Sequence, residues 1–236
     1  MTERDKILGR IREALTISAP PPGEHGPETH HLAGHPIPFA PRPAATNARE
    51  WLPKVGETID EQIAQFRACS DDLKTEFIVV GSLDELPKIL GEIRQREGWK
   101  QAAAHNGELT DAAVRALALP TLKVDGGYNV RELERCDVGI TECDALVAQT
   151  GTLVVTSRSS GGRALSVLPP HHLVIARREQ LVPDLPAAFE LIQKKYDADY
   201  PSMISFVTGP SRTGDIERIL VLGAHGPKKL TVICVG

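Results

Sequence analysis

The chain has 236 residues, of which 41% are hydrophobic, and this is enough for one sizeable α/β domain or two small ones. Its 27 Lys and Arg are nearly balanced by 31 Asp and Glu, so the composition indicates neither a basic face for nucleic acid nor a polybasic cluster for a membrane. No apolar stretch approaches the roughly 20 residues of a membrane span, and the first residues lack the apolar core of a signal peptide, so we expect a cytoplasmic protein.

The cysteines are widely spaced, at Cys69, Cys136, Cys143 and Cys234. Because none of them forms a C-x-x-C pair, they do not fit a zinc site or an iron–sulfur ligand set, and we expect buried or incidental thiols. The sequence therefore predicts no metal and no cofactor on this chain. Any redox centre would lie on a partner.

Three segments are predicted along the chain. Residues 1–15 form an amphipathic helix, with Ile7, Leu8, Ile11 and Leu15 at helical spacing. Such a short helix is marginal in water, so it needs a surface to pack on, such as a second subunit. Residues 16–50 are a linker rich in proline and histidine, and residues 51–236 are the α/β domain. The linker histidines could ligate a metal, but a solvated linker is favoured; they are His25, His30, His31 and His35.

Strands and helices alternate after residue 51. Apolar periodicity predicts helices around residues 59–66, 86–93 and 109–117, and apolar runs predict strands at 76–81, 101–105, 121–124 and 137–141. This alternation indicates a mainly parallel, doubly wound sheet with helices on both faces. Residues 144–149 and 151–156 break the rhythm and predict an inserted antiparallel hairpin. A polar loop at 157–163, a strand at 173–176, a helix at 185–192 and strands at 203–207 and 229–235 complete the domain.

The segment Thr208–Glu217 is the most informative one. It follows a short apolar run, and its Gly-Pro-Ser-Arg-Thr turn precedes apolar residues at Ile216, Ile219 and Leu220, a pattern that predicts strand, tight turn and helix. Ser211, Arg212 and Thr213 would then lie at a helix N-terminus, where unpaired backbone N–H groups favour an anion. A simple helix cap explains the same residues, so both interpretations stay open.

Ligands of open α/β sheets bind beyond the carboxyl ends of the strands, and we expect this segment and the 157–163 loop to meet there. Arg212 is either a surface ion-pair residue or an anion clamp. A structural role is favoured for His172 over a general base, and His225 is expected to follow a helix. Glu142 and Asp144 are expected to be solvated loop carboxylates rather than an acid pair. The chain contains no G-x-G-x-x-G, Walker A or G-x-S-x-G motif.

Four blocks carry a family resemblance: Asp137–Thr141, Gln149–Val154, Leu168–Val174 and Gly209–Glu217, the last followed by Leu220–Pro227. Over about residues 50–236 they resemble the LUD-domain proteins of the LutC/YkgG type. The resemblance implies a fold like the NagB/RpiA/CoA-transferase group. It also implies a non-redox subunit that acts with an iron–sulfur partner and a cysteine-rich partner in oxidising L-lactate to pyruvate.

We predict from these features a pocket for a small carboxylate or phosphate, and we predict no catalytic residue. The pocket residues are Gln149, Thr150, Arg163, His172, Gly209, Ser211, Arg212 and Thr213. The family commonly has an acid where this chain has Gln149, and an amide can position a ligand but cannot act as a base. Two other functions stay open, a stand-alone isomerase, CoA-transferase or cyclo-ligase-like enzyme and a purely structural subunit.

Overall fold

The computed structural model describes residues 4, 6–9, 12, 53–216, 219–223 and 225–236, and for residues 213–216 and 219–222 it describes the backbone alone. The chain divides into two units, residues 1–48 and 49–236. In the first unit residues 6–9 are helical, and Ile7 and Leu8 are exposed. Ile11, Leu15, the linker histidines and the rest of the predicted linker lie outside the described residues.

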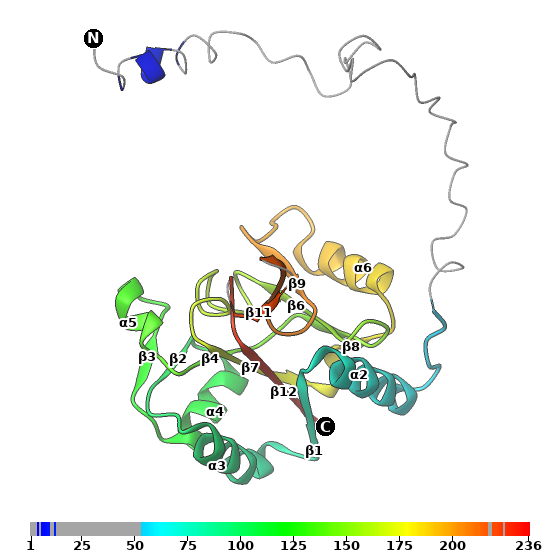
Figure 1. Ribbon diagram of the computed structural model, residues 1–236. Helices are drawn as coiled ribbons and strands as arrows, with labels where there is room; N and C mark the ends of the chain where they lie inside the picture. The colour runs from blue at the N-terminus through cyan, green and yellow to red at the C-terminus, as the bar shows by residue number, and fades with distance from the viewer. Residues whose placement is uncertain (1–3, 5, 10–11, 13–52, 217–218, 224) are drawn as a thin grey trace, which may run out of the picture. The chain divides into compact units, whose positions relative to one another are not determined.

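A six-stranded parallel sheet is the centre of the second unit (Figure 1). Its strands are, in spatial order, β1 (Glu76–Val80), β12 (Lys229–Val235), β7 (His171–Arg177), β4 (Val138–Thr141), β2 (Ala102–Ala104) and β3 (Thr121–Lys123). Every neighbouring pair is parallel. The central strands are continuous apolar runs because both of their faces are covered. The predicted mainly parallel α/β sheet is confirmed.

Helices α3 (Leu86–Glu97) and α4 (Glu108–Leu117) cover one face of this sheet. Side chains alternate along a strand, so Leu173 and Ile175 of β7 pack against these helices, whereas Val174 and Ala176 point to the opposite face. Short helix α5 (Val130–Glu134) lies beside the β3 edge, with Leu133 buried. Two 3-10 turns occur at Leu83–Glu85 and Arg178–Gln180.

The opposite face is covered by helix α2 (Ile59–Leu73) and by a second, four-stranded sheet. The second sheet has the order β8 (Leu181–Val182), β5 (Ala145–Val147), β6 (Thr152–Thr156) and β9 (Ile204–Val207). The predicted hairpin is therefore present as β5 and β6, but it stacks on the parallel sheet through Leu146 and Leu153 instead of joining it. Helix α6 (Leu185–Tyr196) packs on the outer face of the second sheet. The unit thus has four layers, helix, sheet, sheet and helix.

The predicted helix after residue 213 is wrong. Residues 212–216 form β10 (Arg212–Ile216), which pairs antiparallel with β11 (Ile219–Leu222). The spacing of apolar residues fits a helical face, but Ile219–Leu222 is also a continuous β-like run, and cross-strand pairing decides between the two. Consequently Ser211 to Thr213 do not lie at a helix N-terminus, and His225 follows a strand rather than a helix.

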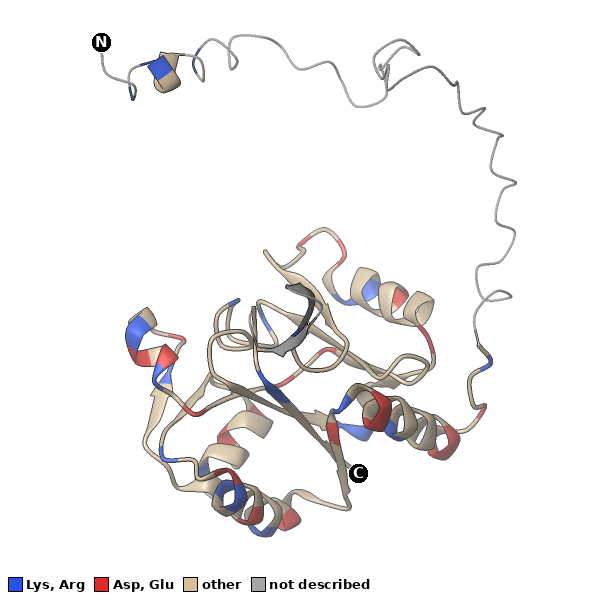
Figure 2. Ribbon diagram, viewed as in Figure 1, with Lys and Arg blue, Asp and Glu red and all other residues tan. Residues whose placement is uncertain are grey.

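Cys136, Cys143 and Cys234 are buried and Cys69 is half-buried, and all four thiols are free. Burial raises the pKa of each of these thiols. The prediction of buried thiols is confirmed for three of the four. Figure 2 shows basic and acidic residues interspersed along α2, α3 and α5, in line with the nearly balanced charge. Within the described part of the chain no helix is both long and apolar enough to cross a bilayer.

Candidate functional site

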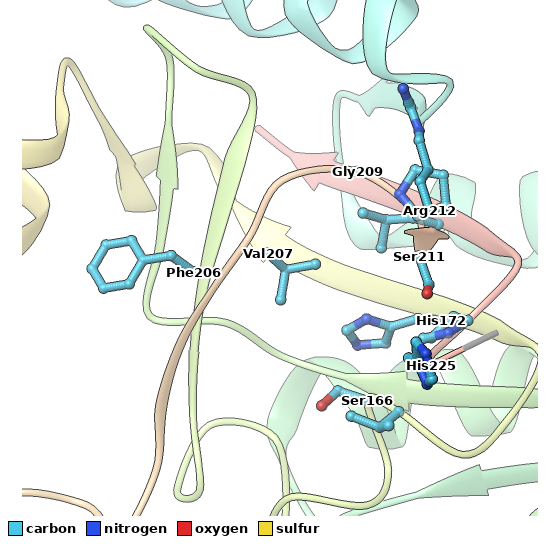
Figure 3. A pocket seen from close by; sticks show the side chains of 12 residues that line it. Ser166, His172, Phe206, Val207, Gly209, Ser211, Arg212 and His225 are labelled. Atoms are coloured by element: carbon cyan, nitrogen blue, oxygen red, sulfur yellow. The ribbon is translucent and has the colours of Figure 1, made fainter. Parts of the chain in front are cut away.

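A cavity of about 320 Å³ lies between the start of the central parallel strands and the segment that follows β9 (Figure 3). His172 and Leu230, the second residues of β7 and β12, form its floor. The other lining residues are Ser166, Val167, Phe206, Val207, Gly209, Pro210, Ser211, Arg212, His225 and Pro227. The cavity is therefore at the amino ends of the parallel strands. The expected position beyond their carboxyl ends is wrong, because the preceding strand β9 is not part of the parallel sheet and pairs antiparallel with β6 in the second sheet.

His172 is the most buried polar residue of the cavity, with 1% of its surface exposed. One ring nitrogen, Nε2, lies 2.8 Å from the hydroxyl oxygen of Thr141 at the end of β4. Burial, together with the neighbouring His171, lowers the pKa of His172 to about 3. The imidazole is therefore neutral at physiological pH. It can exchange hydrogen bonds with a ligand but does not supply a positive charge.

The backbone of Ser211 is held from two sides. Its N–H donates to the carbonyl of Pro227 at 2.9 Å, and its carbonyl accepts from the N–H of Gly223 at 2.9 Å. The predicted anion site relied on a free N–H at this position, and this N–H is already used. At Ser211 the side-chain hydroxyl remains to bind a ligand, and Figure 3 shows the Arg212 guanidinium pointing the other way. Arg212 is exposed, and the described lining residues include no carboxylate.

Gly209 allows the turn that carries these residues. Its φ is +83°, a left-handed value that favours glycine, and a Cβ at this position would approach the Cβ of Leu73 to 3.2 Å. Gly139 allows two segments to approach closely on the opposite wall, because a Cβ there would lie 2.3 Å from the carbonyl oxygen of Leu165. The segment that carries Ser166 therefore packs directly on strand β4.

Arg163 lies outside the cavity. Its guanidinium donates to the carbonyl of Ser202 at 2.5 Å, on the connection between α6 and β9. Its own carbonyl accepts a long hydrogen bond of 3.5 Å from the Ser166 hydroxyl. Arg163 therefore supports a cavity wall through its backbone, and its charge points elsewhere.

Gln149 and Thr150 also lie outside the cavity, at the turn between β5 and β6. The Gln149 side chain donates to the carbonyl of Pro53 at 2.6 Å, and its buried oxygen has no hydrogen-bond partner among the described residues. Hydroxyl contacts of 2.7 and 2.8 Å run from Thr150 to Thr152 and on to Thr208, the residue before Gly209. These contacts support the turn at Gly209 from outside the cavity. The side chain of Thr213 lies outside the described atoms.

Of the eight predicted pocket residues, the structure thus brings His172, Gly209, Ser211 and Arg212 together at one cavity. The sequence pattern does not distinguish the apolar lining residues Val207 and Leu230 from ordinary core residues. Phe206 also lines the cavity, but its ring packs against Phe189 of α6. A structural role is favoured over a functional one for His225 from the sequence, and the structure places this residue in the lining of the same cavity.

Glu142 and Asp144 bind different elements, and the expectation of solvated carboxylates is wrong for Asp144. Glu142 accepts from the N–H groups of Leu109 at 2.9 Å and Thr110 at 3.3 Å, at the start of α4. Asp144 is 3% exposed and accepts from the Lys195 ammonium and the Tyr196 hydroxyl, each at 2.6 Å. Burial alone would raise the pKa of Asp144, but the hydrogen bonds from Lys195, Ser159 and Tyr196 lower it below its usual value.

Comparisons with known proteins agree with the fold. Residues 44–235 match the model of the LUD domain. The chain is 30% identical over 208 residues to lactate utilization protein C of Geobacillus sp. strain WCH70, covering 82% of this chain and 86% of that protein.

The proteins of the same name from Anoxybacillus flavithermus and Bacillus subtilis strain 168 are each 37% identical, over 110 and 112 residues. In these two matches the chain spans about half of the relative, 49% and 47% of its length. The crystal structure of a DUF162 family protein from Deinococcus radiodurans superposes with a TM-score of 0.61 at 25% identity, covering 77% of this chain and all of that one.

Proposed function

The chain belongs to the LUD domain family, and on that premise we propose that it serves lactate utilisation in the cytoplasm by binding a small carboxylate in the cavity between His172 and Arg212. Relatives named lactate utilization protein C support the physiological part of this proposal. The ligand part depends on one observation, a cavity whose described lining has an arginine and no carboxylate.

The lining suits a 2-hydroxy or 2-oxo acid. A guanidinium can hold a carboxylate with two parallel hydrogen bonds. Arg212 is exposed, and Figure 3 shows its side chain directed away from His172, so it has to turn inward to hold the carboxylate. The neutral imidazole of His172 and the hydroxyls of Ser166 and Ser211 can then bond the second oxygen of the acid. Lactate and pyruvate have this pair of groups, so one site can accept either.

We place the acceptor of the electrons on an iron–sulfur partner that works with a cysteine-rich partner. Oxidation of a 2-hydroxy acid to a 2-oxo acid releases two electrons and two protons, so an acceptor is required. The described residues include no group of three or more His, Cys, Asp or Glu arranged to hold a metal ion. This chain would bind and orient the acid, and the redox step would need the assembled complex.

Calorimetric titration with L-lactate and pyruvate tests the ligand part. We expect Arg212→Gln to weaken binding about tenfold or more, the usual effect of losing a charge-assisted hydrogen bond. Arg163→Gln is the matched control, because that guanidinium points away from the cavity. Absence of binding to the unaltered protein would contradict the proposal. Thermal stabilisation by a sugar phosphate, CoA or folate, but not by lactate, would favour the stand-alone enzyme.

Growth on L-lactate tests the physiological part. A strain without the chain should grow poorly, restoration should fail with Arg212→Gln and succeed with Arg163→Gln, and co-purification should recover an iron–sulfur protein. Normal growth on L-lactate without the chain would contradict a role in lactate utilisation. Restoration by Arg212→Gln would instead favour a structural subunit.

A further inference from the structure

Two adjacent buried histidines begin strand β7, and each of them meets a threonine hydroxyl. Nε2 of His171 lies 2.8 Å from the hydroxyl oxygen of Thr231, and Nε2 of His172 lies 2.8 Å from that of Thr141. Burial lowers the pKa of His171 to about 4 and that of His172 to about 3, so both imidazoles are neutral at pH 7. A neutral imidazole has one N–H donor and one acceptor nitrogen, and the threonine contact decides which nitrogen carries the proton.

The hydroxyl of Thr231 uses its proton elsewhere. It donates to the carboxylate of Glu76 at 3.0 Å, so its oxygen accepts from Nε2 of His171. The proton of this imidazole is therefore on Nε2. Nδ1 of His171 is buried and has no partner among the described residues. Because Nδ1 is then an acceptor, the arrangement leaves no buried N–H of His171 unpaired.

The hydroxyl of Thr141 differs from that of Thr231. Thr141 has no exposed surface, and within the described part of the chain its hydroxyl forms a hydrogen bond with His172 alone. If Nε2 of His172 carried the proton, the hydroxyl proton of Thr141 would be buried without an acceptor, which is costly. If the hydroxyl donates to Nε2 instead, both groups are satisfied and the imidazole proton is on Nδ1.

Nδ1 is the nitrogen of His172 that remains for a ligand. His172 lines the cavity, and Figure 3 shows the hydroxyl of Ser211 directed to the side of the cavity where this imidazole lies. A ligand oxygen can accept from an N–H at this position, whereas an ammonium group has no lone pair to accept with. The hydroxyls of Ser166 and Ser211 can both donate and accept, so they do not make this distinction.

We propose that Thr141 fixes the imidazole of His172 as an Nδ1–H donor, and that this donor makes the cavity select acids with an oxygen on C2 over 2-amino acids. The inference rests on the proposed acid site and names the pair of residues that sets its selectivity. His172 contacts the ligand, and Thr141 is a positioning residue that acts through His172. A 2-oxo oxygen accepts from Nδ1, and a 2-hydroxyl group can accept from Nδ1 while it donates to a serine.

Nitrogen-15 NMR of the histidine rings tests the tautomers in the absence of any ligand. At pH 7 we expect Nδ1–H for His172 and Nε2–H for His171, with His172→Gln and His171→Gln used to assign the signals. Thr141→Val should allow the Nε2–H form of His172 to appear, and Thr141→Ser should prevent it. An Nε2–H form of His172 in the unaltered protein, or no change in Thr141→Val, would overturn the inference and leave the proposed function intact.

Titration with pyruvate, L-lactate and L-alanine tests the selectivity. We expect the unaltered protein to bind both oxygen-bearing acids at least about tenfold more tightly than alanine, because alanine places an ammonium against the N–H of His172. Thr141→Val should weaken pyruvate binding about threefold to tenfold, and Thr141→Ser should restore it. Thr231→Val is the matched control, because it removes the hydroxyl beside His171 and should leave pyruvate binding unchanged.

The titrations separate the inference from the proposed function. Binding of alanine as tightly as pyruvate would overturn the selectivity and leave the acid site intact. Equal losses of pyruvate binding in Thr141→Val and Thr231→Val would overturn the positioning role of Thr141. Failure of pyruvate and lactate to bind the unaltered protein would contradict the acid site itself, and melting temperatures check that each variant folds.

Discussion

Asp144→Asn should destabilise the protein by about 3 kcal/mol, the lower end of the range for breaking a buried ion pair. The side chain of Asp144 has no exposed surface, whereas that of Lys195 is 50% exposed. In the variant Lys195 can turn to water, which limits the loss. The Tyr196 hydroxyl loses its bond to a charged acceptor and keeps its contact with Thr156 at 3.1 Å. Urea unfolding followed by circular dichroism measures the change, and the melting temperature should fall by about 6–12 °C.

The pH dependence gives a second test of the same pair. The pKa of Asp144 is lower in the folded protein than in the unfolded chain, so its contribution is present above about pH 4 and disappears as the pH falls through the folded value. The difference in unfolding free energy between the variant and the unaltered protein should therefore shrink at acid pH.

The exposed pair of Arg158 and Asp199, close by in the fold, is the control for this prediction. Its side chains are 48% and 85% exposed, so Asp199→Asn should change the unfolding free energy by no more than about 0.5 kcal/mol. A loss below about 1 kcal/mol in Asp144→Asn, or equal losses in the two variants, would refute the reasoning.

Three further predictions concern other elements. Gly139→Ala should lower the unfolding free energy by about 1–3 kcal/mol and weaken lactate binding, because its Cβ would meet the Leu165 carbonyl; unchanged urea unfolding would contradict this contact. Thr58→Ala should lower it by about 1 kcal/mol, because Thr58 and Glu61 form a capping box on α2; an unchanged thermal midpoint would argue against the cap. A thiol reagent at pH 8 should modify Cys69 first in the native protein, because the other three cysteines are buried; rapid modification of two or more thiols would disprove their burial.

Local patterns are sufficient for elements whose pattern fits a single structure. Leu185, Ala188 and Ile192 repeat at helical spacing, and the structure has helix α6 at these residues. The apolar runs of β7 and β12 have no polar face, which indicates strands covered on both sides. His172 and Gly209, which the sequence assigns to one pocket, both line the cavity, although it lies at the other end of the strands.

Distant partners explain what the sequence could not show. Ile216 and Ile219 fit a helical face as well as a hairpin, and the pairing of Thr213 with Val221 selects the hairpin. The local sequence indicates a loop carboxylate at Asp144, because its partner Lys195 is 51 positions away in the sequence. The second sheet cannot be predicted from local sequence either, because a short apolar strand has the same pattern whether it joins the parallel sheet or belongs to a second sheet packed on it.

The position of β12 has a consequence for biosynthesis. It lies between β1 and β7, and its Thr231 bonds to Glu76 of β1 across 155 positions of sequence. Until residues 229–235 have been synthesised, β1 has no neighbouring strand in its sheet, and its backbone hydrogen-bonding groups stay unpaired along that edge. The parallel sheet therefore closes only after nearly all of this sequence has emerged. A nascent chain stalled before β12 should be a substrate for chaperones rather than a partly folded domain.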